Sequence, residues 1–420
     1  MNRWLLLLLF PLCLISYQET IAIFPINVFR PWDLNLRPTP WPGKHIQLVG
    51  YDEIGLKVQA FDADKSRENV MQLWTDTQDA IAMLQGFPAS SPFYQYYTNV
   101  LMMPVDDGIR GNFLVKGHFE MTASAGLSCY YRFPHYVTLS AHIPFYAMSV
   151  SHVNFMDLTQ NNNNASNLRV KQNLTNNFAA RLLQFDPTLT INGWSRVGFG
   201  DLGIMAEWRQ GFKQSKPYLK NVELALRTCL TLPTGLQRNE NQILSVPFGY
   251  EALGLMFGAG IKLTWLDWVR AGVDFEFLQL FGNNRTFRIK VQEDQTDFLL
   301  LAQAKAHKEF GFTQRYNLCL ETCPLVRGLS IGMAYEFWKH GKDKYDLLDE
   351  SFSAKIANSA QSLQEWTMHQ LIFKLWYDCA GDVREDSAFR PQFLFFYKVP
   401  VNGKRALLIN SIGAQITMNF

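Results

Sequence analysis

The sequence predicts an all-β fold: a transmembrane antiparallel β-barrel of about twelve strands, with helical insertions in its long extracellular loops. Three features of the 420 residues predict it. Apolar and polar residues alternate over many long segments, the connections between these segments are short and long in turn, and the chain ends on an alternating stretch that finishes with Phe420. Hydrophobic residues make up 48% of the chain, yet its mean hydropathy is only −0.09, as interleaving of apolar and polar residues requires.

The N-terminus has the composition of a secretory signal peptide. A basic residue, Arg3, precedes an apolar run that ends at Ile15, and the small residue Ala22 follows. This run is too short for a membrane-spanning helix, and no later stretch offers about 18 uninterrupted apolar residues. We therefore predict a signal peptide over 1–22, a periplasmic segment over 23–44 and the barrel over 45–420.

The first strand can be placed in two ways. In 45–61 the apolar residues alternate, but Asp52 falls on their face, which a bulge near Gly50 would explain. The segment 93–103 is the alternative.

The segment 66–86 has a helical pattern. Ser66 is a capping residue, Gly86 is a typical stop, and apolar residues recur between them at helical spacing. Because an apolar stripe needs a surface to pack on, we expect this helix to plug or cap the barrel. The segments 174–185 and 295–308 have similar patterns.

The clearest strand is 113–133, "FLVKGHFEMTASAGLSCYYRF". Its odd positions are apolar or small, whereas its even positions carry most of the polar residues. A helix cannot separate these two sets, but a strand with period 2 does. The same alternation recurs in 137–146, 201–209, 222–230, 253–265, 269–277, 314–323, 328–338, 367–379, 389–399 and 405–420.

The connections supply an independent indication. Short ones at 134–135, 213–219 and 266–267 alternate with long ones such as 233–249 and 281–312. Transmembrane barrels combine short periplasmic turns with longer extracellular loops in this way. The last extracellular connection is predicted to be a tight type I′ turn at Asn402-Gly403.

The polar faces of these strands predict the lining of the lumen. Basic and acidic residues are mixed from strand to strand, which indicates either cross-strand pairs in a narrow, partly closed lumen or the ordinary mixture of a water-facing surface. The predicted lining residues are Lys116, His118, Glu120, Arg132, His142, Asp201, Glu207, Arg209, Glu223, Arg227, Lys262, Arg270, Asp274, Glu276, Arg315, Glu321 and Lys374.

The C-terminus carries a resemblance to a known class. A final Phe420 preceded by Met418, Ile416 and Ala414 on the same strand face resembles the assembly signal that the outer-membrane barrel-insertion machinery recognises. With the signal peptide and the alternating strands, the chain over about 30–420 resembles bacterial outer-membrane β-barrel proteins. The resemblance implies a location in that membrane, with its lipid and the insertion machinery as partners.

A narrower resemblance involves two stretches. "GFGDLGIMAEWRQGF" (198–212) and "LRTCLTLPTG" (226–235) are similar to paired strands in barrels linked to uptake of aromatic compounds.

No sequence motif predicts catalysis. Walker A, HExxH and GxSxG motifs do not occur, so we predict no catalytic residue, metal site or cofactor. Ser140 and His142 share a face as in barrel phospholipases, but no third, orienting group can be named. The net charge of +2 indicates no nucleic-acid partner. We expect a channel or transporter for passive passage of small solutes, narrow or partly plugged. A structural or surface-interaction barrel is the alternative, followed by a barrel enzyme acting on lipids.

Overall fold

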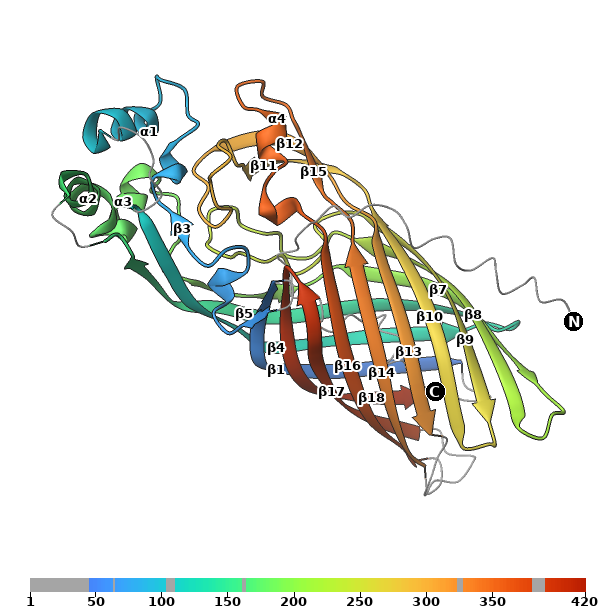
Figure 1. Ribbon diagram of the computed structural model, residues 1–420. Coiled ribbons are helices and arrows are strands. Elements are labelled where there is room, and N and C mark those ends of the chain that lie inside the picture. The colour runs from blue at the N-terminus through green and yellow to red at the C-terminus, as the bar shows by residue number, and fades with distance from the viewer. Residues whose placement is uncertain (1–44, 63–64, 103–109, 161–163, 323–327, 380–389) are drawn as a thin grey trace, which may run out of the picture.

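The computed structural model describes residues 45–62, 65–102, 110–160, 164–322, 328–379 and 390–420, and it shows a closed antiparallel barrel of 12 strands (Figure 1). The segments predicted as signal peptide (1–22) and periplasmic segment (23–44) lie outside the described residues. The barrel closes because β1 (Ile46–Asp62) pairs with both β4 (Asn112–Arg132) and β18 (Ala406–Asn419). The remaining wall strands are β5 (Val137–Asp157), β7 (Leu202–Lys213), β8 (Leu219–Leu232), β9 (Gly254–Trp265), β10 (Val269–Leu280), β13 (Thr313–Thr322), β14 (Leu329–His340), β16 (Trp366–Asp378) and β17 (Arg390–Lys404).

The outward-facing side chains form an apolar belt around the barrel. Leu226, Phe257 and Leu318 are 56%, 57% and 53% exposed, and each alternates with inward-facing residues of its strand. A water-soluble protein rarely exposes apolar residues over so large a surface, whereas a membrane-spanning barrel presents such a belt to lipid. Among the described residues, no helix is long and apolar enough to cross a membrane.

The first strand is β1, which confirms the placement over 45–61. The alternative segment instead forms the short helices α1 (Pro92–Gln95) and η4 (Tyr96–Leu101). The predicted bulge near Gly50 is wrong, because pairing with β18 runs unbroken past Asp52 and shifts only between Gly55 and Lys57. Asp52 is exposed on the outer face.

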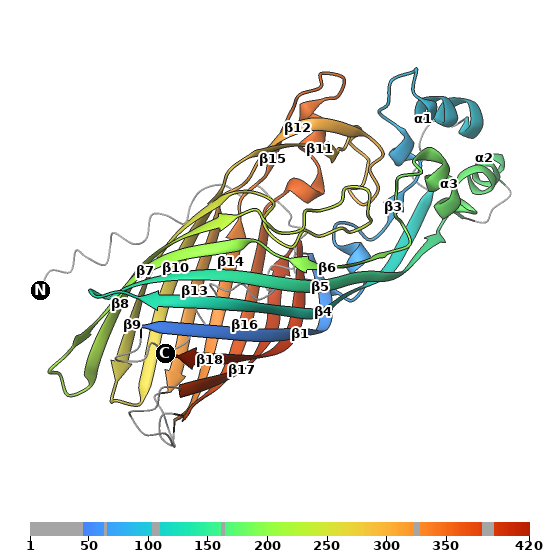
Figure 2. The ribbon, with the colours of Figure 1, turned by 180° about the vertical axis from the view of Figure 1, so that it is seen from behind.

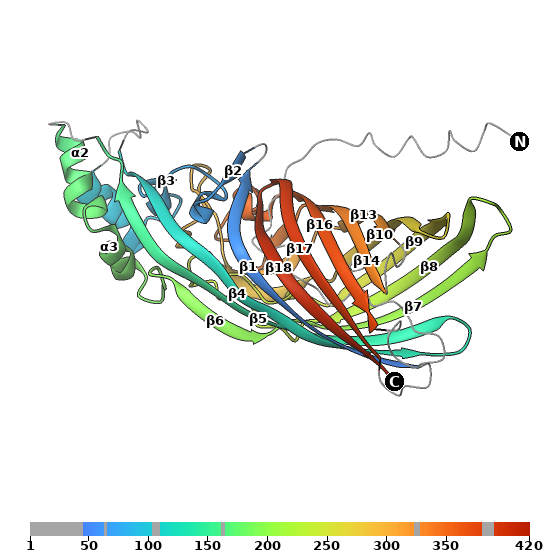
Figure 3. The ribbon, with the colours of Figure 1, turned by 90° about the horizontal axis from the view of Figure 1, so that it is seen from below.

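β4 and β5 continue past the other strands toward α2 (Ala165–Val170) and α3 (Phe178–Phe185) (Figure 3). One extra residue of β4 between Met121 and Ala123 shifts the register with β5 and exchanges the two faces of the strand. Between this bulge and Arg132, which we call below the bulge, Leu127 is exposed on the outer face. Between the bulge and Asn112, which we call above it, Phe113 is buried inside.

This exchange corrects part of the predicted lining. Lys116, His118 and Glu120 lie above the bulge and are exposed on the face opposite the packed one, so they do not line the lumen. The alternation in the sequence is uninterrupted there, because a protein core selects apolar residues just as lipid does.

The other segments gather at the end of the barrel with the long connections, the loop end (Figures 1 and 2). The connection from β1 to β4 contains β2 (Lys65–Arg67), η2 (Val70–Gln72), β3 (Gln78–Asp79), η3 (Ala82–Leu84), α1 and η4. The chain continues after β5 with α2, η5 (Lys171–Thr175), α3 and β6 (Trp194–Phe199). β6 pairs with residues 145–150 of β5, whereas β7 pairs with residues 137–142. A separate sheet consists of β11 (Asn283–Arg288), β12 (Gln303–Glu309) and β15 (Lys344–Leu347). In the sequence, α4 (Ala354–Ala357) and η6 (Gln361–Leu363) follow β15.

The predicted helix over 66–86 is wrong, although its apolar residues are buried. Asn69 accepts a hydrogen bond from Met71 N, and Asp79 accepts from Ile81 N and Ala82 N. Such side-chain bonds to nearby backbone favour turns over a continuous helix.

Two other helical predictions have mixed outcomes. The helix over 174–185 is partly confirmed by η5 and α3, whereas the one over 295–308 is wrong because its second half forms β12.

The reversal between β17 and β18 lies at Arg405, which has a φ of 53°. The predicted turn at Asn402-Gly403 is therefore wrong. Both residues remain in β17, where Asn402 pairs with His369 and Gly403 with Met368 of β16.

The chain ends beside its first strand. Phe420 N donates to Ile46 O at 2.9 Å, so β18 is paired with β1 to the last residue. Phe420 is 45% exposed, and Ala414 is exposed on the same face. The outward orientation fits the predicted assembly signal, whose recognition stays a prediction.

Candidate functional site

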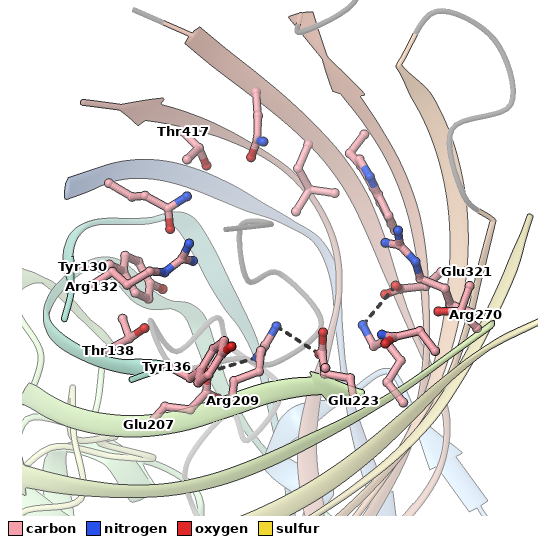
Figure 4. A pocket seen from close by; sticks show the side chains of 18 of the residues that line it. Tyr130, Arg132, Tyr136, Thr138, Glu207, Arg209, Glu223, Arg270, Glu321 and Thr417 are labelled. Atoms are coloured by element: carbon pink, nitrogen blue, oxygen red, sulfur yellow. Dashed lines mark hydrogen bonds and ion pairs between the residues drawn. The ribbon is translucent and has the colours of Figure 1, made fainter. Parts of the chain in front are cut away.

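The lumen contains a cavity of about 970 Å³, which we call the vestibule (Figure 4). It lies at the end of the barrel with the short connections, the turn end, because His135 and Tyr136 of the β4–β5 turn and Asp267 of the β9–β10 turn line it. Its other charged and aromatic lining residues are Tyr130, Arg132, Phe133, Glu207, Arg209, Lys213, Lys220, Glu223, Lys262, Arg270, Glu321, Trp376 and Phe393.

The acids of the vestibule are paired with cations. Arg209 lies 3.1 Å from Glu207 and 3.5 Å from Glu223. Glu321 lies between two lysines, with Lys374 Nζ at 2.9 Å and Lys262 Nζ at 3.1 Å. Three of these pairs join different strands and hold the lining in place, whereas Arg209 and Glu207 both lie on β7.

Deeper in the barrel the charged groups are buried, in what we call the charged layer. Arg227 Nη2 contacts Asp274 at 2.7 Å, and Arg227 Nη1 contacts Glu276 at 3.2 Å. Arg315 bridges Glu276 at 2.8 Å to Glu336. Since these groups are withdrawn from water, each needs its ion-pair partners to compensate for the hydration that it has lost.

A second buried ion pair lies inside the barrel, on the side opposite this network. Lys398 Nζ is 3.3 Å from Glu53, and both side chains are almost fully buried. Ser411 donates to the same carboxylate. This pair was not predicted from the sequence. The alternation of Lys398 with the outward-facing Phe395 and Tyr397 would have assigned the lysine to the inner face.

Beyond the charged layer, the loop end is filled by apolar side chains, which we call the loop core. Barrel residues such as Phe119 and Met148 pack there with residues of four loop-end connections. The loop residues are Val70, Met71, Ala80, Ile81, Met83, Leu84, Leu101, Val170, Leu174, Phe178, Leu182, Leu189, Ile191, Ile243, Leu244, Val246, Phe248, Phe298, Leu299 and Leu301.

Arg288 ties several of these connections together. Its guanidinium donates to Asp186 at 2.6 Å, to Asn241 at 2.6 Å and to Leu300 O at 3.1 Å. The three acceptors belong to connections that are far apart in the sequence. One side chain therefore fixes their relative positions.

The Ser140–His142 pair does have a third partner. His142 Nε2 lies 2.9 Å from Ser140 Oγ, and His142 Nδ1 lies 2.9 Å from Ser128 Oγ. Ser140 is 4% exposed and His142 is 0% exposed, and a buried serine nucleophile that no substrate can reach cannot act on lipid. The arrangement cross-links β4 and β5.

The predicted lining residues thus fall into three groups. Arg132, Glu207, Arg209, Glu223, Lys262, Arg270 and Glu321 line the vestibule. His142, Arg227, Asp274, Glu276, Arg315 and Lys374 lie in the deeper polar contacts. The others lie elsewhere: Lys116, His118 and Glu120 face outward, and Asp201 accepts from Gly235 N and Tyr250 N, so that it anchors a loop.

The barrel resembles solved outer-membrane proteins. An outer membrane channel from Pseudomonas putida F1 matches at 11% identity with a TM-score of 0.50, over 92% of this chain and 100% of that chain. The NanC porin (8% identity, 73% of this chain, 98% of that chain) and a Pseudomonas aeruginosa FadL homologue (8% identity, 90% of each) match with TM-scores of 0.28 and 0.29, too low to carry an argument. No family and no curated protein matches the sequence.

The fold is that of a bacterial outer-membrane β-barrel. Together with the apolar belt, it places the chain in the outer membrane, as the sequence predicted. The turn end then faces the periplasm and the loop end the exterior. The stretches 198–212 and 226–235 do contain paired strands, since β7 pairs with β8.

Proposed function

We propose that the protein is a channel for small solutes that is closed in the state described here. The observation that carries the proposal is the vestibule: a cavity of about 970 Å³ inside a closed barrel, with many charged side chains in its lining. A barrel with a purely structural role has no need of such a cavity, because side chains can fill a small barrel completely.

Closure is attributed to the two regions above the vestibule. The charged layer joins consecutive strands from β8 to β14, on one side of the wall, through buried Arg227 and Arg315. The loop core packs apolar side chains of the wall and of the connections together at the loop end. Opening requires the loop core to move, since apolar packing leaves no path for a hydrated solute. The connection from β1 to β4 is the natural moving part, because it enters the core through short, irregular elements and not through wall strands.

A structural or surface-interaction barrel is the second candidate. The observation that favours it is the large loop-end assembly, in which β4 and β5 extend beyond the other strands and carry α2 and α3 (Figure 3). Such an assembly is suited to contact with a partner outside the cell.

Conductance in planar bilayers separates the two candidates. The intact protein is expected to conduct little. Replacing residues 65–110 by a short Gly/Ser linker is expected to raise conductance many-fold while heat-modifiable migration shows that the barrel still assembles. β1 and β4 are neighbours, so such a linker can join them.

Arg288→Ala is a milder variant that loosens the loop core without a deletion. Its conductance is expected to lie between those of the intact and the deleted protein. Assembled barrels that conduct in none of the three forms would contradict the channel and support the structural barrel.

A further inference from the structure

The vestibule has an uneven balance of charge. Among the residues that the structure describes, six basic and four acidic residues line it. The basic ones are Arg132, Arg209, Lys213, Lys220, Lys262 and Arg270, and the acidic ones are Glu207, Glu223, Asp267 and Glu321.

Each of the four acids already has a basic neighbour. Glu207 and Glu223 contact Arg209, and Asp267 lies 3.5 Å from Lys220. Glu321 is shared by Lys262 and by Lys374, which approaches from deeper in the wall. The negative charge of the lining is therefore neutralised by ion pairs.

Arg270 differs from these acids in its contacts. Among the described residues, its guanidinium makes no hydrogen bond and no ion pair. Its cross-strand neighbours are Thr264 on β9 and Glu321 on β13, but the two lysines already hold the Glu321 carboxylate. Arg270 thus presents five N–H donors and a full positive charge to the cavity.

The charged layer above has the reverse balance. Its two arginines, Arg227 and Arg315, face three acids, Asp274, Glu276 and Glu336. Counted over the described residues, positive charge therefore exceeds negative charge in the accessible vestibule, while negative charge exceeds positive charge in the buried layer. A cavity with low-dielectric walls concentrates the field of such a surplus.

We propose that the vestibule binds small organic anions, with Arg270 as the principal anion-binding group. A guanidinium binds carboxylates and other planar or tetrahedral anions through paired N–H donors. The volume of the cavity is in the range of small-molecule sites. The proposal deepens the proposed channel function, because it names the class of solute that the lumen holds.

The potential at Arg270 can be measured with a cysteine beside it. Thr264→Cys places a thiol in the lining on the residue that pairs with Arg270. Its reaction rate is compared for two methanethiosulfonate reagents, one carrying a sulfonate and one a trimethylammonium group. Any change in the thiol pKa affects both rates equally, so their ratio reports the local potential. The unsubstituted protein gives the background of the native cysteines.

A positive potential of about one kT favours the anionic reagent by about sevenfold over a free thiol in solution. We expect at least this ratio for Thr264→Cys, and a ratio near that of the free thiol when Arg270→Gln is added. Arg181→Gln replaces a half-buried arginine of α3 at the loop end. It is the matched control and should leave the ratio unchanged. The proposal would be overturned if Thr264→Cys, with Arg270 intact, gave the same ratio as a free thiol.

Binding itself is tested by protection of the same cysteine from uncharged methyl methanethiosulfonate. At constant ionic strength, succinate should slow the reaction, whereas 1,4-diaminobutane of the same chain length should not, and Arg270→Gln should abolish the protection. An anion site would be contradicted if both compounds protected the cysteine equally, or if neither compound protected it. Both readouts use the closed protein, so a failure here is distinct from a failure to conduct in bilayers.

Discussion

The periplasmic half of the lumen contains water-accessible charged and amide side chains around a cavity, whereas the extracellular half is packed with apolar residues from the wall and from four connections. The same long strands build both halves. β4 shows the difference most clearly, because Leu127 faces lipid below its bulge and Phe113 faces the loop core above it. A single inserted residue thus converts a membrane wall into the support of a water-excluding core.

The difference between the halves should be largest when a buried charge loses its partner. Arg315→Met leaves Glu276 and Glu336 in the charged layer without this cation, which costs about 3–5 kcal/mol of unfolding free energy. Arg270→Met in the vestibule removes no ion pair and should cost less than about 1 kcal/mol. Urea unfolding in detergent micelles measures both. Similar losses would show that the two regions are equally buried.

The wall can be tested by moving an arginine from one face to the other. Ile261→Arg places a charge in the apolar belt, where it costs about 2–4 kcal/mol near the bilayer midplane. Thr264→Arg, three residues along β9, points into the vestibule and should be tolerated. The assembled fraction on a heat-modifiability gel reports the difference. Equal yields would mean that the faces of β9 are assigned wrongly.

The loop core should loosen without loss of the barrel when its central contact is removed. Arg288→Ala deletes charge-assisted hydrogen bonds to Asp186 and Asn241, which contribute on the order of 1.5–3 kcal/mol each when buried. We expect faster hydrogen exchange in 165–191 and 233–250, with unchanged exchange in β8, β9 and β10. Uniform acceleration over all strands would indicate one cooperative unit and would weaken the contrast between the halves.

The smallest effect concerns pH at the loop end. Burial alone would raise the pKa of Asp343, but the charges of Lys308 and His340 outweigh it and hold that pKa well below its usual value. Because the pKa is lower in the folded than in the unfolded chain, this carboxylate stabilises the loops above about pH 4 and loses the effect as the pH falls below that value.

Asp343→Asn should accordingly lower the stability of the loop-end structure at neutral pH, and the gap to the unsubstituted protein should narrow below about pH 4. Limited proteolysis over a pH series measures it. A gap that widens on acidification would mean that the sign of the pKa shift is wrong.

The positions and order of the strands could be predicted because the wall strands keep period-2 alternation, with Asp52 of β1 as an exception. β9 and β10 are examples, since their apolar residues are uninterrupted from Leu255 to Trp265 and from Val269 to Phe277. What the alternation could not reveal is which face points inward above the bulge of β4. Lipid and a protein core select the same side chains, so Lys116 and Glu120 looked like lumen residues.

The candidate site was predictable as a face but not as a set of contacts. Arg270 is next to Glu321 by strand register, and a prediction from the sequence would pair them. In the folded barrel Lys374 reaches Glu321 from two strands away and Lys262 from the other side. Only the three-dimensional arrangement shows that both lysines, and not Arg270, hold the Glu321 carboxylate.

The central claim is that the lumen is open to the periplasm and closed to the exterior, and the sidedness of labelling tests it most directly. Thr138→Cys lies in the vestibule, and Lys57→Cys, at a position where the lysine side chain is 47% exposed, lies toward the loop end of β1. A bulky, impermeant maleimide applied to intact cells should label Lys57→Cys and spare Thr138→Cys. After the outer membrane is permeabilised, Thr138→Cys should react as well. Rapid labelling of Thr138→Cys from outside intact cells would contradict a closed extracellular half.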